Sequence, residues 1–180
     1  MQISTWNQRP KTSTALTASI CLFAALALPA AANPITEGYI LSGDNAQIHY
    51  LRARSASAEH SLLFIPGWRV SASIWSKQIT YFSSRGYDIV AIDSRSQGGS
   101  TVARRGNAPE DRASDIQHVI AGLHLAHVAL VGWSQGAQDV SAYVNRFGTD
   151  ALDALALIDS PVSSGSTDAT DNSVFVKIIL

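Results

Sequence analysis

The sequence has one cysteine, Cys21, and only 15% of its 180 residues are charged. Cys21 lies in the apolar N-terminal segment, so no disulfide can form within the chain. The formal net charge is −1, and residues 33–180 alone carry 11 basic and 14 acidic residues. This mild negative balance argues against a nucleic-acid partner and against binding to an anionic membrane surface.

The N-terminus has the three parts of a secretory signal peptide. Arg9 and Lys11 precede the apolar run 15–28, which Pro29 ends, and Ala30-Ala31-Ala32 supplies small residues for cleavage. The alternatives are a buried helix or a membrane anchor, but the run is shorter than the ~20 residues that span a bilayer. We therefore predict a signal peptide over 1–32 and export to the periplasm or the medium, with no membrane anchor left after cleavage.

The rest of the chain alternates between apolar runs and helical periodicity. Two short runs around a polar linker predict an antiparallel hairpin at 38–41 and 47–51. Further strands are predicted at 62–65, 88–92, 128–131 and 154–158, and helices at 73–85, from Pro109 onward, and at 135–147. Strands that are apolar on both faces and alternate with helices predict an α/β fold, with a mostly parallel sheet covered on both sides.

Helical spacing also predicts which side chains face the core. In the helix 73–85 the inward residues would be Trp75, Ile79 and Phe82, with Gly86 ending the helix. In the helix 135–147 they would be Ala137, Val140, Val144 and Phe147, with Gly148 as the stop. The segment 161–180 is predicted to be a loop, with the start of a cap domain or an aberrant tail as its alternatives.

Gly132-Trp133-Ser134-Gln135-Gly136 fits the pattern G-x-S-x-G between a predicted strand and a predicted helix. A tight turn there would project Ser134 into open space, and the two glycines would remove side chains where strand and helix cross. The first N–H groups of the helix would favour negative charge at the same place. This context predicts that Ser134 is a nucleophile, and the alternative is an ordinary turn that contains a serine.

At these residues the chain resembles the α/β-hydrolase family, over 37–160. Leu62–Trp68 resembles the oxyanion loop of that family, although Pro66-Gly67 stands where His-Gly is common. Asp93–Ser100 resembles the D-x-R-G-x-G-x-S loop, with Ser96 where glycine is usual, and Asp93 would brace that loop. The resemblance implies an α/β-hydrolase fold that ends after about the sixth strand, with 33–160 as the N-terminal part of the domain.

The resemblance also implies roles for individual residues. Ser134 would attack an acyl carbon, and the backbone N–H groups of Gln135 and Trp68 would form the oxyanion hole. Asp159 is a candidate for the catalytic acid, and an ordinary turn is its alternative. Trp68 and Trp133 would form an aromatic wall or pack in the core.

The sequence has no histidine after Ser134, where the family carries its general base. The five histidines all precede it: His49, His60, His118, His124 and His127. None is expected to be the base. His118, His124 and His127 have the spacing H-x5-H-x2-H, which is not a helical metal-binding pair, so no metal and no cofactor are predicted.

The predicted function is a serine hydrolase that acts on small carboxylic esters, because a serine nucleophile favours acyl chemistry. A haloperoxidase-like activity without a cofactor and a non-catalytic, truncated or decayed product are the alternatives. We expect a longer native reading frame that supplies the missing histidine. The oligomeric state stays open.

Overall fold

The computed structural model describes residues 33–160, so the predicted signal segment 1–32 and the predicted loop 161–180 lie outside the described residues. Within this range the elements are β1 (Ile35–Leu41), β2 (Gln47–Ala53), β3 (Ser61–Ile65), the 3-10 helix η1 (Ala72–Trp75), α1 (Ser76–Ser83), β4 (Asp88–Ile92), α2 (Pro109–Gly122), β5 (Val128–Trp133), α3 (Gln135–Phe147) and β6 (Leu152–Ile158).

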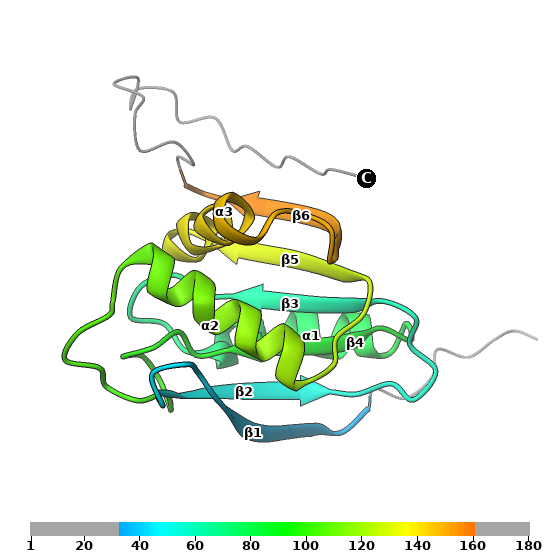
Figure 1. Cartoon of the computed structure of the whole chain (residues 1–180). Coiled ribbons are helices and arrows are strands. Elements are labelled where there is room, and N and C mark those ends of the chain that lie inside the picture. Colours follow the sequence, from blue (N-terminus) through cyan, green and yellow to red (C-terminus); the bar gives the residue numbers. More distant parts are fainter. Residues whose placement is uncertain (1–32, 161–180) are drawn as a thin grey trace, which may run out of the picture.

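The described strands form one sheet in the order β1-β2-β4-β3-β5-β6. β2 pairs antiparallel with β1 and with β4, whereas β4, β3, β5 and β6 run parallel. Helices α2 and α3 cover one face of the sheet, and α1 covers the other (Figure 1). The predicted α/β fold class is therefore confirmed.

The central strands β3 and β4 explain why this arrangement forms. All five residues of each strand are buried, as the continuous apolar runs predicted. Because side chains alternate along a strand, Leu63 and Val90 pack under α2 and α3, whereas Phe64 and Ile89 pack against η1 and α1. Each central strand thus contributes to two cores, one on each face of the sheet.

The helix ends differ in part from the prediction. The segment expected as a helix over 73–85 begins as a 3-10 turn and ends at Ser83, although Gly86 does adopt a left-handed φ of 87°. The bounds of α3 agree with the prediction. Gly148, with φ of 75°, follows its last residue.

One predicted core residue of α3 is wrong. Phe147 is 36% exposed, whereas Tyr143 is 1% exposed and donates its hydroxyl proton to Gln117 Oε1 at 3.0 Å. The ring of Phe147 lies over that of Tyr143, with 5.3 Å between centroids. At 3.6 residues per turn, Phe147 lies on the same side of α3 as the buried Val140, but it is the last residue of the helix, so its exposure comes from its place at the helix end.

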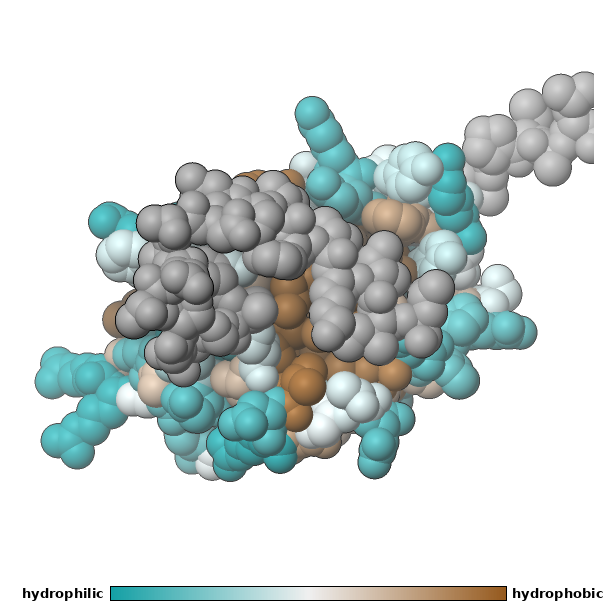
Figure 2. Space-filling view, turned by 90° about the horizontal axis from the view of Figure 1, so that it is seen from above, coloured by the Kyte–Doolittle hydropathy of each residue, from teal (hydrophilic) through white to brown (hydrophobic). Residues whose placement is uncertain are grey.

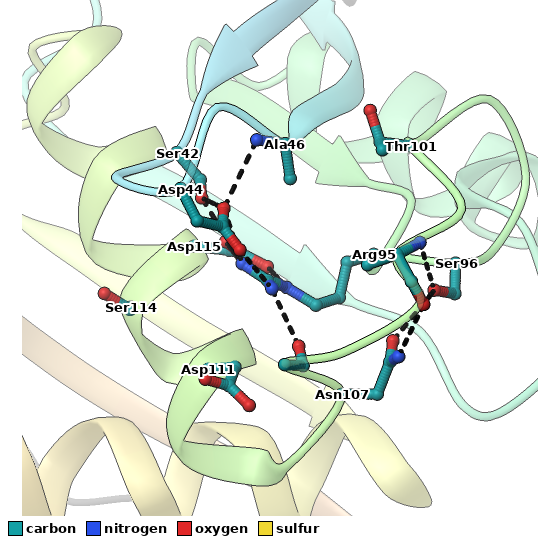
Figure 3. Close-up of polar contacts among 12 residues, drawn as sticks. Ser42, Asp44, Ala46, Arg95, Ser96, Thr101, Asn107, Asp111, Ser114 and Asp115 are labelled. Atoms are coloured by element: carbon teal, nitrogen blue, oxygen red, sulfur yellow. Dashed lines mark hydrogen bonds and ion pairs between the residues drawn. The ribbon is translucent and has the colours of Figure 1, made fainter.

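A buried arginine joins three segments that are far apart in the sequence (Figure 3). The guanidinium of Arg95, in the loop after β4, donates to both carboxylate oxygens of Asp115 on α2 at 2.6 Å. It also donates to Asp44, in the turn between β1 and β2, at 2.9 Å, and to the Gly106 carbonyl at 2.7 Å. Hydrogen bonds from Ser42 and Arg95 hold the pKa of Asp44 well below its ordinary value.

The last described strand, β6, pairs only with β5 among the residues of the described range. Seen from above in Figure 1, apolar residues are visible near the middle of the molecule, and polar residues lie toward its lower and right-hand outline (Figure 2). No helix within residues 33–160 is long and apolar enough to cross a bilayer.

Replacing Asp115 with Asn should lower the free energy of unfolding strongly. The side chains of Arg95 and Asp115 are each 2% exposed, and removing one partner of a buried pair costs about 3–5 kcal/mol. Urea denaturation of the variant measures the loss. The control is Asp150→Asn at an exposed position, which should change stability by less than about 0.5 kcal/mol. Equal losses in both variants would contradict a large contribution of the Arg95–Asp115 ion pair to the free energy of unfolding.

Candidate active site

Ser134 occupies a strained turn between β5 and α3. Its φ of 53° and ψ of −118° lie in a region that residues other than glycine rarely adopt, at a cost of about 1–3 kcal/mol. The backbone N–H of Ser134 donates to the Ile158 carbonyl at 2.8 Å, and its own carbonyl accepts from the N–H of Ala137 at 3.0 Å. The neighbouring strand β6 and the helix α3 thus hold the turn, and the serine is half-buried.

The two glycines of the motif leave no space for a side chain. A Cβ atom on Gly132 would lie 2.4 Å from the Gly136 carbonyl oxygen. A Cβ atom on Gly136 would lie 2.4 Å from the carbonyl oxygen of Ile65 and 2.7 Å from that of Pro66. These neighbours are backbone atoms that cannot rotate away, which is the steric reason for the G-x-S-x-G spacing.

The loop after β3 packs directly against this turn. A Cβ atom on Gly67 would lie 3.2 Å from Ser134 Cβ and 3.0 Å from the ring of Trp133. Trp68 follows Gly67, and Gln135 is the first residue of α3. Within residues 33–160, the backbone N–H groups of Trp68 and Gln135 have no hydrogen-bond acceptor. Two N–H groups that flank a serine in this way can bind a negatively charged oxygen.

The two tryptophans near the serine have different surroundings. Trp68 is 69% exposed, so its ring does not pack in the core, and the Arg69 guanidinium lies 5.8 Å from the ring centroid. Trp133 is half-buried and packs against the core under α1. Core packing, one of the two predicted roles for this pair, therefore describes Trp133. The other role, an aromatic wall near Ser134, stays a prediction for Trp68.

Asp159 reaches the same edge of the sheet as Ser134. Trp133 and Ile158 are register partners on the parallel strands β5 and β6, and Ser134 and Asp159 each follow them directly. Asp159 is exposed and has a φ of 55°. The sheet thus brings the predicted nucleophile and the candidate acid together, and the catalytic role of each stays a prediction.

The five histidines lie elsewhere. The ring of His49 on β2 contacts Asp93 at 2.9 Å, and β2 is three strand positions from β5, or about 14 Å. His118 bonds the Ser114 carbonyl on its own helix at 2.7 Å. His60 and His127 directly precede β3 and β5, at the opposite edge of the sheet from Ser134, and His124 follows α2. None of these positions suits a general base for Ser134.

The predicted bracing role of Asp93 is visible in its contacts. Its carboxylate accepts from the backbone N–H of Ala72 at 2.5 Å and of Gly99 at 2.7 Å. A side chain on Gly98 would lie 2.2 Å from the same carboxylate. Ser96 has a φ of 64°, which explains why glycine is usual at this position of the motif.

An ion pair behind the serine turn was not predicted from the sequence. Arg112 Nε on α2 donates to Asp139 Oδ1 on α3 at 2.8 Å. With its side-chain amide turned over, Gln135 would also accept from Arg112 Nη2 at 2.8 Å. Arg112 therefore ties the first turn of α3 to α2. The sequence contained one sign of this ion pair: the acidic residue Asp139 stands next to Val140, on the side of α3 that was predicted to face the core.

Asp139 is fully buried, and its Oδ2 has no hydrogen-bond partner within the described part of the chain. Burial raises the pKa of Asp139 to about 6, although the charge of Arg112 opposes this shift.

A family model described as the alpha/beta hydrolase fold matches residues 60–176. The chain is 30% identical to a non-heme haloperoxidase of Rhodococcus erythropolis over 67% of its own length and 43% of that protein. It is also 30% identical to a bifunctional esterase/perhydrolase of Acinetobacter calcoaceticus over 68% of its own length and 44% of that protein. The chain thus spans less than half the length of these curated relatives.

Solved structures show the same likeness. An esterase from Rhodococcus sp. ECU1013 superposes with a TM-score of 0.64 and 26% identity, over 71% of this chain and 46% of that one. An esterase from Exiguobacterium antarcticum superposes with a TM-score of 0.63 and 24% identity, over 68% of this chain and 44% of that one. The second likeness concerns the fold alone.

Replacing Gly136 with Ala should displace α3 from β3, because the new Cβ would collide with two backbone oxygens. We expect a destabilisation of about 1–3 kcal/mol, as for other overpacked sites, measured by urea denaturation. Gly43→Ala is the control, because its Cβ would meet no backbone atom and only the side chain of His118, at 3.3 Å. A Gly136→Ala variant as stable as this control would contradict the steric argument.

The raised pKa of Asp139 should make stability fall as the pH rises. The folded protein retains a proton on Asp139 up to about pH 6, whereas the unfolded chain releases it near 3.8. Stability from this group is complete below 3.8 and is lost as the pH passes 6, a change of about 3 kcal/mol. Unfolding free energies at pH 4 and pH 7 should therefore differ more for the native protein than for Asp139→Asn. Equal differences would show that Asp139 ionises normally.

Proposed function

The chain belongs to the α/β-hydrolase family, and on that premise we propose that it acts as a serine hydrolase on small carboxylic esters through Ser134. The observation that carries the proposal is the strained Ser134 turn, fixed between two glycines that admit no side chain and packed against Gly67. A serine held this way projects its hydroxyl at the start of a helix, where negative charge is favoured.

In the proposed reaction Ser134 Oγ attacks the acyl carbon and gives its proton to a general base. The negative charge on the former carbonyl oxygen is stabilised by the N–H groups of Gln135 and Trp68, each worth about 3 kcal/mol in such sites. The C–O bond to the alcohol then breaks as the base returns the proton to the alcohol oxygen. Water attacks the acyl-enzyme in the same way and releases the acid.

The general base must come from outside residues 33–160, because none of the five described histidines is placed to contact Ser134. We propose that a histidine elsewhere in the native protein takes this role. Asp159, beside Ser134 at the end of β6, is our candidate for the acid that orients the ring. We also propose that the N-terminal segment 1–32 directs export of the protein.

A second candidate function is supported by the names of the relatives. They include a non-heme haloperoxidase and a bifunctional esterase/perhydrolase. Hydrogen peroxide in place of water would attack the same acyl-enzyme and release a peroxy acid, with no metal or cofactor needed. Ester hydrolysis and perhydrolysis would therefore share Ser134 and differ in the second nucleophile.

A fluorophosphonate probe tests the role of Ser134. We expect the protein isolated from its native cells to be labelled on the peptide that contains Ser134, and Ser134→Ala to lose both labelling and ester hydrolysis. Ser141→Ala, on the same helix with its hydroxyl bonded to the Ala137 carbonyl, is the matched control and should retain both. Assays with and without hydrogen peroxide separate the two candidate functions.

The 180-residue chain alone tests the origin of the base. Without a histidine beside Ser134, labelling should be slower by about 10³-fold or more. If this chain reacts as fast as the native protein, one of the five early histidines is the base. Absence of labelling in the native protein would favour a non-catalytic role.

A further inference from the structure

Three side chains with metal-binding atoms meet at the edge of the sheet opposite Ser134. His60 directly precedes β3, His127 directly precedes β5, and Asp153 is the second residue of β6. These strands are neighbours in the sheet order. Ser134 follows the far end of the six-residue strand β5, so the two sites are about 20 Å apart.

The three side chains point toward one another. The Nδ1 atom of His60 lies 3.0 Å from Asp153 Oδ2, and the Nδ1 atom of His127 lies 3.2 Å from the Asp153 carboxylate. All three prospective ligand atoms lie within 4.8 Å of one another. The side chains are 53%, 62% and 42% exposed for His60, His127 and Asp153, so an ion could enter from solvent.

The backbone holds these residues in place. The carbonyl of His127 accepts from the N–H of Ser61 at 3.1 Å, and that of His60 accepts from the N–H of Asp88 at 3.1 Å. A register shift between β5 and β6 pairs Val128 with Leu152 and Ala129 with Ala154, so Asp153 has no partner across the strands. Such a bulge redirects a side chain, and here the redirected carboxylate meets both imidazoles.

Two imidazole nitrogens and one carboxylate oxygen are a donor set that suits zinc, with a fourth position left to water. In a tetrahedral zinc site the ligand atoms lie about 3.3–3.5 Å from one another. The present separations of 3.0 and 3.2 Å between Asp153 and the two rings are close to that spacing. Binding would need both Nδ1 atoms to lose their protons, with each ring keeping its proton on Nε2.

We propose that His60, His127 and Asp153 form a binding site for Zn²⁺ that is separate from the proposed catalytic serine. The ion would join the amino ends of β3, β5 and β6. Because the three ligands come together only in the folded sheet, bound zinc would stabilise the folded protein by mass action.

Calorimetric titration of chelator-treated protein with Zn²⁺ tests the proposal. We expect saturable binding of one ion per chain, a higher thermal midpoint with zinc, and the visible absorption of tetrahedral Co²⁺ when cobalt replaces it. Removing one ligand in His127→Gln or Asp153→Asn should weaken binding by about tenfold or more. His124→Gln is the matched control, because His124 is exposed near the same edge but outside the cluster.

The outcomes separate the alternatives. Absence of saturable binding would overturn the proposal and leave an exposed hydrogen-bonded trio. Unchanged affinity in both ligand variants, or equal weakening in His124→Gln, would also overturn it. If His127→Gln does not fold, Asp153→Asn and the cobalt spectrum still decide. Binding that persists in Ser134→Ala would support a site independent of the proposed function, whether or not the serine reacts with the probe.

Discussion

The close approach of α3 to the end of β3 is the constraint on which the rest of this edge depends. Because Gly136 lies against the carbonyl oxygens of Ile65 and Pro66, the first turn of α3 and the loop after β3 occupy one small region. That contact places Gly67 beside Ser134 and leaves the serine backbone in its positive φ. Any side chain at position 136 would separate the proposed nucleophile from the N–H groups expected to stabilise negative charge.

The sheet order brings residues together at both of its ends. At one end, the parallel pairing of β5 with β6 places Asp159 beside Ser134. At the other end, the neighbouring strands β3, β5 and β6 place His60 and His127 on either side of Asp153. In a parallel sheet all carboxyl ends share one edge and all amino ends share the other, so one topology can support two chemically distinct clusters.

The sequence predicted the features that depend on neighbours along the chain. The apolar runs of β3 and β4 are buried on both faces, so their pattern indicated strands without ambiguity, and the motif around Ser134 needs only five consecutive residues. The contacts it missed join distant positions. Arg112 and Asp139 are 27 residues apart, and His60 and Asp153 are 93 apart. The bulge that redirects Asp153 depends on strand register, which local periodicity does not encode.

Contacts within the described residues and contacts from elsewhere also have different parts in the proposed chemistry of Ser134. Its turn is fixed by Ile158 on one side and Ala137 on the other, so residues 33–160 determine the backbone geometry of the proposed nucleophile. Activation of the hydroxyl requires one further contact, a base about 3 Å from Oγ that an acid holds in orientation. A turn and an oxyanion hole without that base retain only a small part of the rate of a complete triad. Under the proposed function, the strained backbone therefore prepares the serine, and activity depends on an imidazole placed beside its hydroxyl.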